Sequence, residues 1–207
     1  MSPTPSLTAE RSHSHVMGGA SDPISPATAQ RARRGGLAIG AMFFAMFGAL
    51  WLLIAYQLAH GQTWAPIAVV LVVALLLFGS ALWVVRARRG AMLALRDTAE
   101  SQRMRRQFGR INVVQWIAVV MVVLVLHGLA LGVWIVPAIM LVVGLHFLPL
   151  ARVFRYRPHG LTGAVLIATA VVYPFASAAG PAAPVGSVIA GITLWLAALW
   201  SLRPTNT

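Results

Sequence analysis

The sequence predicts an all-α protein, a bundle of six transmembrane helices with both chain ends on the cytoplasmic side. Of its 207 residues, 59% are hydrophobic and only 10% are charged, whereas a soluble domain carries roughly a quarter charged residues. The long apolar runs contain no Asp, Glu, Lys or Arg, so they are suited to face lipid. The sixteen basic residues are all arginine and lie in clusters outside those runs.

The first segment, residues 1–36, is expected to be a disordered, basic cytoplasmic tail. It is rich in small and polar residues, and Arg31, Arg33 and Arg34 lie close to its end. A segment of this composition cannot bury enough apolar surface to offset its ordering entropy. The apolar run that follows exceeds the apolar core of a signal peptide, so we expect it to be retained as the first span.

Run length predicts where the chain crosses the membrane, because about 20 helical residues span the hydrocarbon core. Two later runs are about twice this length and must fold back. The first breaks near Gly132 to Pro137 and the second near Ala179 to Pro184, where glycine and proline favour turns and helix starts. The transmembrane domain 37–203 then holds spans near 37–59, 64–85, 111–131, 134–153, 161–178 and 185–202.

The arginines predict the orientation of the bundle. They lie before span one, between spans two and three, between spans four and five, and after span six. The other three loops are uncharged. Cytoplasmic loops carry an excess of basic residues, so both ends are predicted to be cytoplasmic.

The segment 86–110 is expected to be a solvated basic loop, with a short interfacial helix as the alternative. It holds eight of the arginines against Asp97 and Glu100. Anionic lipid headgroups are the expected partners of these arginines. Arginine clusters between apolar runs are typical of loops that set the orientation of a membrane protein, and not of a nucleic-acid-binding surface. No nucleic-acid partner is therefore expected.

Two sequence patterns bear on helix packing. His60-Gly61 before Trp64 and His127-Gly128 before Trp134 occupy similar outer turns, which is suggestive of three related helical hairpins. Stripes of small residues indicate close helix approaches. They comprise Ala41, Ala45 and Ala49 in span one, Gly128 and Gly132 at the end of span three, and Gly186 and Ala190 in span six.

His146 is the main candidate for a functional residue, because it is a titratable side chain about one turn from the middle of span four. Pro149 cannot donate a backbone hydrogen bond to the carbonyl of Leu145, which leaves a histidine beside a freed carbonyl in the apolar interior. Such a site could bind a ligand, relay protons or hold haem. The alternative is a neutral imidazole bonded to a neighbouring helix, where it stabilises packing.

Three further polar residues complete the candidate ligand site. His127 lies toward the outer end of span three, and Asn112 and Gln115 lie at its cytoplasmic start. The depths of His127 and His146 differ by roughly 13 Å at 1.5 Å per residue, whereas metal ligands lie within about 2.1 Å of the ion. We therefore expect no shared metal, and the two amides could equally cap the helix or bond a neighbour.

These features favour a binding or transport protein for a small or apolar molecule over an enzyme. The sequence contains no phosphate loop, no HExxH and no Ser-His-Asp constellation. Ion-coupled transporters usually keep an ionisable group inside the membrane, and here only histidine could serve. Two other classes stay open. One is a structural subunit that docks a membrane-protein partner or another copy, and the other is a haem or redox protein that uses His146 or His127.

The stretch Gly-Leu-His-Phe-Leu-Pro-Leu-Ala at 144–151 resembles a signature in an uncharacterised bacterial family of small, six-span integral membrane proteins. The resemblance covers little beyond spans three and four, and it implies no activity, substrate or ligand. Together with the use of arginine to the exclusion of lysine, it favours a multi-pass protein of the bacterial cytoplasmic (inner) membrane.

Overall fold

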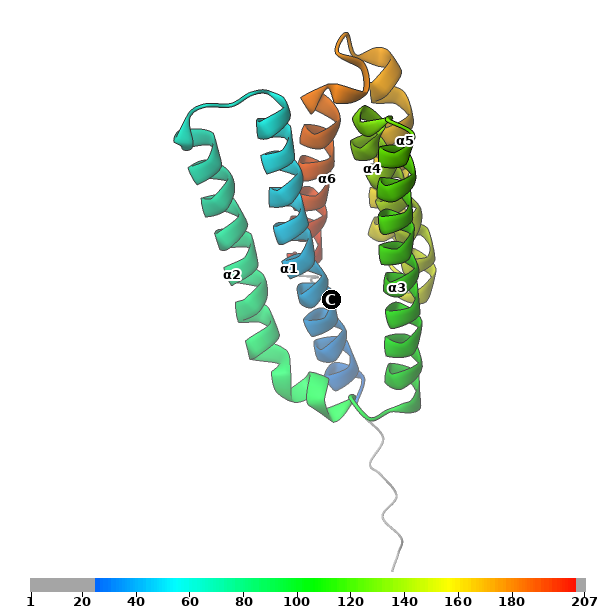
Figure 1. Ribbon diagram of the computed structural model, residues 1–207. Coiled ribbons are helices and arrows are strands. Elements are labelled where there is room, and N and C mark those ends of the chain that lie inside the picture. Colours follow the sequence, from blue (N-terminus) through cyan, green and yellow to red (C-terminus); the bar gives the residue numbers. More distant parts are fainter. Residues whose placement is uncertain (1–24, 204–207) are drawn as a thin grey trace, which may run out of the picture.

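The computed structural model describes residues 25–203, and this part of the chain is helical without strands, which confirms the predicted all-α fold (Figure 1). Short 3₁₀ turns precede the fourth and sixth long helices. The long helices are α1 (Pro26–Leu58), α2 (Trp64–Ala94), α3 (Ala99–Gly128), α4 (Ile135–Val153), α5 (Arg157–Ala176) and α6 (Pro184–Leu202).

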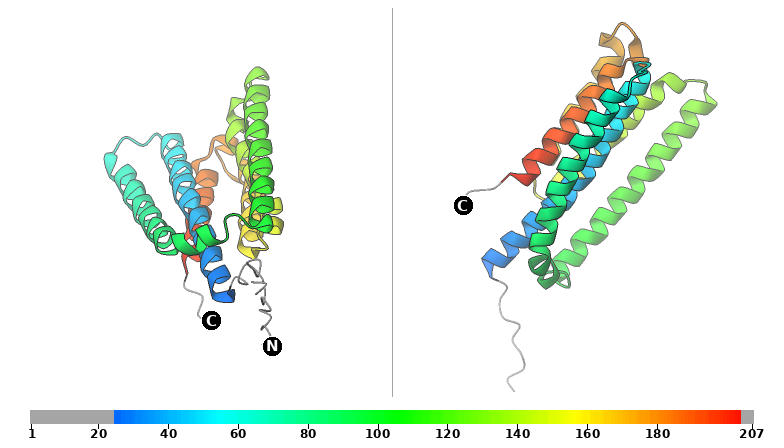
Figure 2. Two further views of the ribbon diagram at one scale, coloured as in Figure 1. Left: turned by 90° about the horizontal axis from the view of Figure 1, so that it is seen from below. Right: turned by 90° about the vertical axis from the view of Figure 1, so that its left-hand side faces the viewer.

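All six helices are long and apolar enough to cross a membrane. Successive helices run in opposite directions, so the start of α1, the links α2–α3 and α4–α5, and the end of α6 lie toward the same end of the bundle (Figures 1 and 2). The arginines of the described residues belong to these same segments. The fold is therefore that of a multi-pass membrane protein with the arginines of residues 25–203 gathered at one end.

Helix α1 begins at Pro26, so the structure differs from the predicted disorder of the tail over residues 26–36. Ser25 caps the helix, because its Oγ accepts a hydrogen bond from the backbone N–H of Thr28 at 3.3 Å. Proline at the first helical position has its backbone preset for a helix start. The remainder of the predicted tail, residues 1–24, lies outside the described residues.

The basic segment 86–110 is also largely helical, which differs from the predicted loop. Helix α2 continues to Ala94 and α3 begins at Ala99. Thr98 caps α3, since its Oγ1 accepts from the N–H of Ser101 at 3.3 Å, and Glu100 lies in the first turn, where a negative charge is favoured. Most arginines of this segment therefore lie on helical extensions of the two spans.

The helices form two groups that meet at the centre (Figures 1 and 2). Helix α1 packs along α2 and α6, and α4 packs along α5 and α3, while α5 and α6 join the groups. Helices α2 and α3 lie on opposite flanks. Helix α3 has no buried residue and α2 only Leu77 and Ala81. The two flanking helices therefore present mostly lipid-facing surface.

Glycines allow close backbone contact at two helix crossings. At the α1–α6 crossing, a Cβ on Gly191 would lie 2.9 Å from the carbonyl oxygen of Gly48. The indole of Trp195 on α6 donates a hydrogen bond to the carbonyl of Ala45 at 3.1 Å. At the α4–α5 crossing, a Cβ on Gly163 would lie 2.8 Å from the carbonyl oxygen of Gly144. Both contacts leave no room for a side chain between the backbones.

The predicted small-residue stripes have different outcomes. The alanines of span one and the Gly186–Ala190 pair are buried, as expected for close packing. The prediction at Gly128 and Gly132 is wrong for contacts within this chain, because a Cβ on either glycine would meet nothing within 4 Å. These glycines lie where α3 ends and turns toward α4, beyond the face that packs on its neighbour.

Candidate functional site

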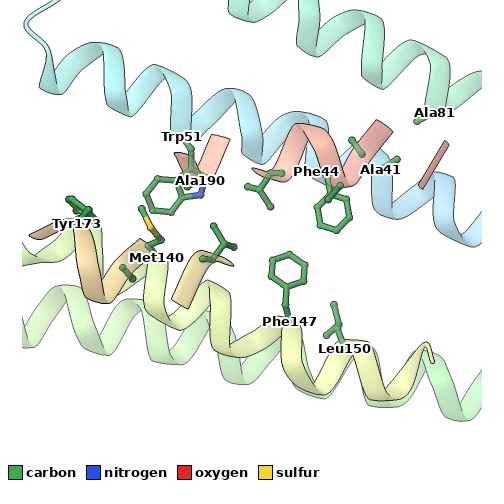
Figure 3. Packing of buried hydrophobic residues seen from close by; sticks show 14 of the residues in the cluster. Ala41, Phe44, Trp51, Ala81, Met140, Phe147, Leu150, Tyr173 and Ala190 are labelled. Atoms are coloured by element: carbon green, nitrogen blue, oxygen red, sulfur yellow. The ribbon is translucent and has the colours of Figure 1, made fainter. Parts of the chain in front are cut away.

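His146 lies on α4 with both ring nitrogens buried, and neither nitrogen has a hydrogen-bond partner among the described residues. Its ring centroid lies 5.4 Å from that of Phe147, whose side chain is buried in the core. Figure 3 shows Phe147 of α4 pointing toward Phe44 of α1, and the two ring centroids are 5.5 Å apart. His146 thus borders the point where the two helix groups meet.

A second buried histidine, His159, lies in the first turn of α5, and only 7% of its surface is exposed. Its Nδ1 has no hydrogen-bond partner in the described part of the chain. Four aromatic rings surround it, with centroids 4.9 to 6.1 Å from its own. They belong to Phe44, Phe147, Phe154 and Tyr156.

The two histidines belong to one cluster, because Phe147 contacts both rings. A neutral imidazole offers one hydrogen-bond donor and one acceptor, and leaving a buried polar group unpaired costs about 1–3 kcal/mol. We call His146 and His159 the histidine pair. The pair places three nitrogen atoms that have no hydrogen-bond partner among the described residues next to the aromatic rings around His159.

The other predicted site residues do not join the histidine pair. His127 is exposed near the end of α3. Asn112 and Gln115 are half-buried on α3, and since α4 is the only long helix against which α3 packs extensively, they face α4. No hydrogen bond links these amides to the histidines within the described residues. Pro149 lies inside α4, and the helix continues past it to Val153.

His159 was missed from the sequence because the fifth span was expected to begin at residue 161. The histidine then lay in a basic loop beside Arg157, where solvent is the natural partner. The available signal was Pro158, which suits the first turn of a helix. Helix α5 begins at Arg157, so a tight α4–α5 turn folds the first turn of α5 back against the aromatic residues of α4.

The chemistry open to this cluster is that of two imidazoles in an apolar setting. They can donate or accept hydrogen bonds, and the surrounding rings can pack on an apolar or planar group. Among residues 25–203 no three His, Asp or Glu side chains gather as a metal site would require.

The fold defines the class, a multi-pass membrane protein with a polar pair inside its helical core. Comparisons of the chain with protein-family models, with curated protein sequences and with solved structures find no match.

Proposed function

We propose that this membrane protein binds a small, largely apolar molecule that carries a hydrogen-bonding group, and that the histidine pair holds that group. One observation carries the proposal: three imidazole nitrogens of His146 and His159 are buried, and no residue in the described part of the chain forms a hydrogen bond with them. In an apolar interior such atoms are destabilising unless something pairs with them. A ligand with a hydroxyl, carbonyl or amide group would supply the missing hydrogen bonds.

The rings around His159 favour an apolar body for the ligand. Phe44, Phe147 and Phe154 come from α1, α4 and the turn after α4, so their rings approach the imidazole from several directions. Aromatic rings gain energy from offset or edge-to-face contact with apolar and planar groups. Binding is favoured over catalysis, because the acids of the described residues are Asp97 and Glu100 at the α2–α3 link, outside the elements that form the histidine pair.

The proposal is tested by extracting the full chain in mild detergent and analysing its organic extract and its native mass spectrum. The wild-type protein is expected to release a molecule in near-stoichiometric amount, which His146→Leu and His159→Phe lose. His127→Leu is the matched control, because this histidine is exposed on α3, and it should retain the molecule. An optical spectrum of the same samples shows whether the molecule is a haem.

Stability measurements separate loss of the site from loss of the fold. Leu at position 146 replaces two unpartnered nitrogens with apolar groups, so stripped His146→Leu should unfold no earlier than stripped wild type. If wild type and both variants are equally empty and His146→Leu unfolds earlier, the imidazole is a packing element and the proposal is wrong.

We further propose that the arginine-bearing end faces the cytoplasm of a bacterial cell, since the basic loops of membrane proteins remain on that side. The sequence contains no cysteine, so single introduced cysteines report topology without background. In intact cells, an impermeant maleimide should label Gln62→Cys and Ala179→Cys. It should label Ala99→Cys only after permeabilisation. Labelling of Ala99→Cys in intact cells would reverse the orientation.

A further inference from the structure

A basic hollow lies at the turn between α4 and α5, and nothing in the proposed function uses it. Its volume is about 460 Å³. Arginine side chains supply its charge, and none of its residues is acidic. In the part of the chain that the structure describes, the acids are Asp97 and Glu100, both in the α2–α3 region. The lining residues are Ala151, Arg152, Arg155, Tyr156, Arg157, Gly160 and Leu161.

The backbone presents Arg155 in a conformation that glycine usually adopts. Its φ is 47°, and the N–H of Tyr156 donates to the carbonyl of Ala151 at 3.1 Å. This is the arrangement that closes a helix with a left-handed residue, most often glycine. A bulky residue there is strained. His60 and Ala130 adopt the same left-handed conformation after α1 and α3, so this conformation belongs to the type of turn, and the site is inferred from the residues that line the hollow.

The start of α5 adds to the positive potential of the hollow. Helix α5 begins at Arg157 and is 20 residues long, and the first turn of a helix carries a partial positive charge that attracts phosphate groups. Arg157 and Gly160 of this turn both line the hollow. Three arginine residues and a helix start therefore border one hollow, and arginine is well suited to bind phosphate oxygens.

An exposed apolar residue lies beside the arginines of the hollow. Leu161 lines the hollow, and 67% of its surface is exposed, although it lies one turn into a membrane-spanning helix. A ligand that places an anionic group on the arginines would thus meet an apolar path along α5. That combination fits an amphiphile at the membrane interface better than a fully solvated ion.

We propose that this hollow binds the phosphate group of an anionic membrane lipid, with Arg155 as the central contact and Arg152 and Arg157 on either side. The lipid chains run along the exposed surface of α5 past Leu161. The site uses neither histidine of the pair and shares with it Tyr156, whose ring packs on His159. The variants below leave Tyr156 and both histidines in place, so this site is tested separately from the proposed function.

The test uses the full-length protein in mild detergent, titrated with short-chain phosphatidylglycerol or with phosphatidylcholine of the same chain length. Thermal unfolding reports binding through the rise in melting temperature. Wild type should be stabilised by phosphatidylglycerol, and Arg155→Gly should need about fivefold more of this lipid for the same rise, the effect of one interfacial basic residue. Glycine suits the φ at this position, so the variant should fold. Arg152→Gln provides a second loss of charge in the hollow.

Arg110→Gln is the matched control, because it removes one exposed arginine from α3 at the same end of the bundle. It should respond to the lipid like wild type. Inorganic phosphate is the third probe: failure to compete at millimolar concentration supports a lipid source, while full competition shows that the site takes free phosphate and overturns the lipid assignment. Equal responses of Arg155→Gly, Arg152→Gln and Arg110→Gln would overturn the site itself.

Discussion

Gly163→Ala should destabilise the protein by about 3 kcal/mol, at the upper end of the cost of overpacking a core. The added Cβ would lie 2.8 Å from the carbonyl oxygen of Gly144 and 2.9 Å from Cβ of Phe147. Neither atom belongs to the mobile end of a side chain, so the two helices must move apart. Separation of α4 from α5 would also disperse the rings around His159. Thermal unfolding of the full chain in mild detergent measures the loss.

Gly79→Ala is the matched control for this glycine crossing. Gly79 lies within α2, and a Cβ added there would meet nothing within 4 Å. Alanine is a better helix former than glycine by about 1 kcal/mol, so this variant should be unchanged or slightly more stable. An equal loss of stability in Gly163→Ala and Gly79→Ala would show that α4 and α5 do not cross closely at Gly163.

Phe44→Ala is expected to cost about 3 kcal/mol, as removal of a buried aromatic ring usually does. Phe44 is 6% exposed and packs on Phe147 at 5.5 Å and on His159 at 5.6 Å between ring centroids. Its ring therefore joins α1 to α4 and α5 across the two helix groups. The variant should unfold at a lower temperature and release any molecule held by the histidine pair.

The neighbouring Phe43 is the control, because it has the same side chain on the same helix and is 50% exposed. Phe43→Ala should change the free energy of unfolding by less than about 1 kcal/mol, since an exposed ring leaves no cavity. If Phe43→Ala were as damaging as Phe44→Ala, the loss would reflect lipid contact rather than the junction between the groups.

The number of spans followed from the sequence, because hydrocarbon thickness fixes how many apolar residues make one crossing. Helix ends were harder to predict. Ser25 and Thr98 cap α1 and α3, but each lies in a polar stretch whose composition resembles a loop. Polar helical extensions lack the apolar signal that marks a span, so hydropathy places the membrane crossing and not the end of the helix.

The candidate site was only half predictable. His146 stood out as a titratable residue within an apolar run, whereas His159 lay among arginines and resembled an interfacial residue. Whether the side chain of His159 faces Phe44 and Phe147 depends on how α5 is rotated about its axis, and only the structure shows this. For the same reason, the packing partners of the small residues could not be predicted. The spacing of small residues within one helix does not identify the partner helix or the face that meets it.

Histidine ring nitrogen NMR of the isotope-labelled full chain shows whether the histidine pair holds a ligand, with His146→Leu and His159→Phe used to assign their signals. The samples are the protein in mild detergent and the same protein after its bound molecules have been stripped. We expect the ring signals of His146 and His159 to shift on stripping, while those of His60 and His127 do not. If the His146 and His159 signals are unchanged by stripping, these nitrogens bind no ligand and the histidine pair is a structural element.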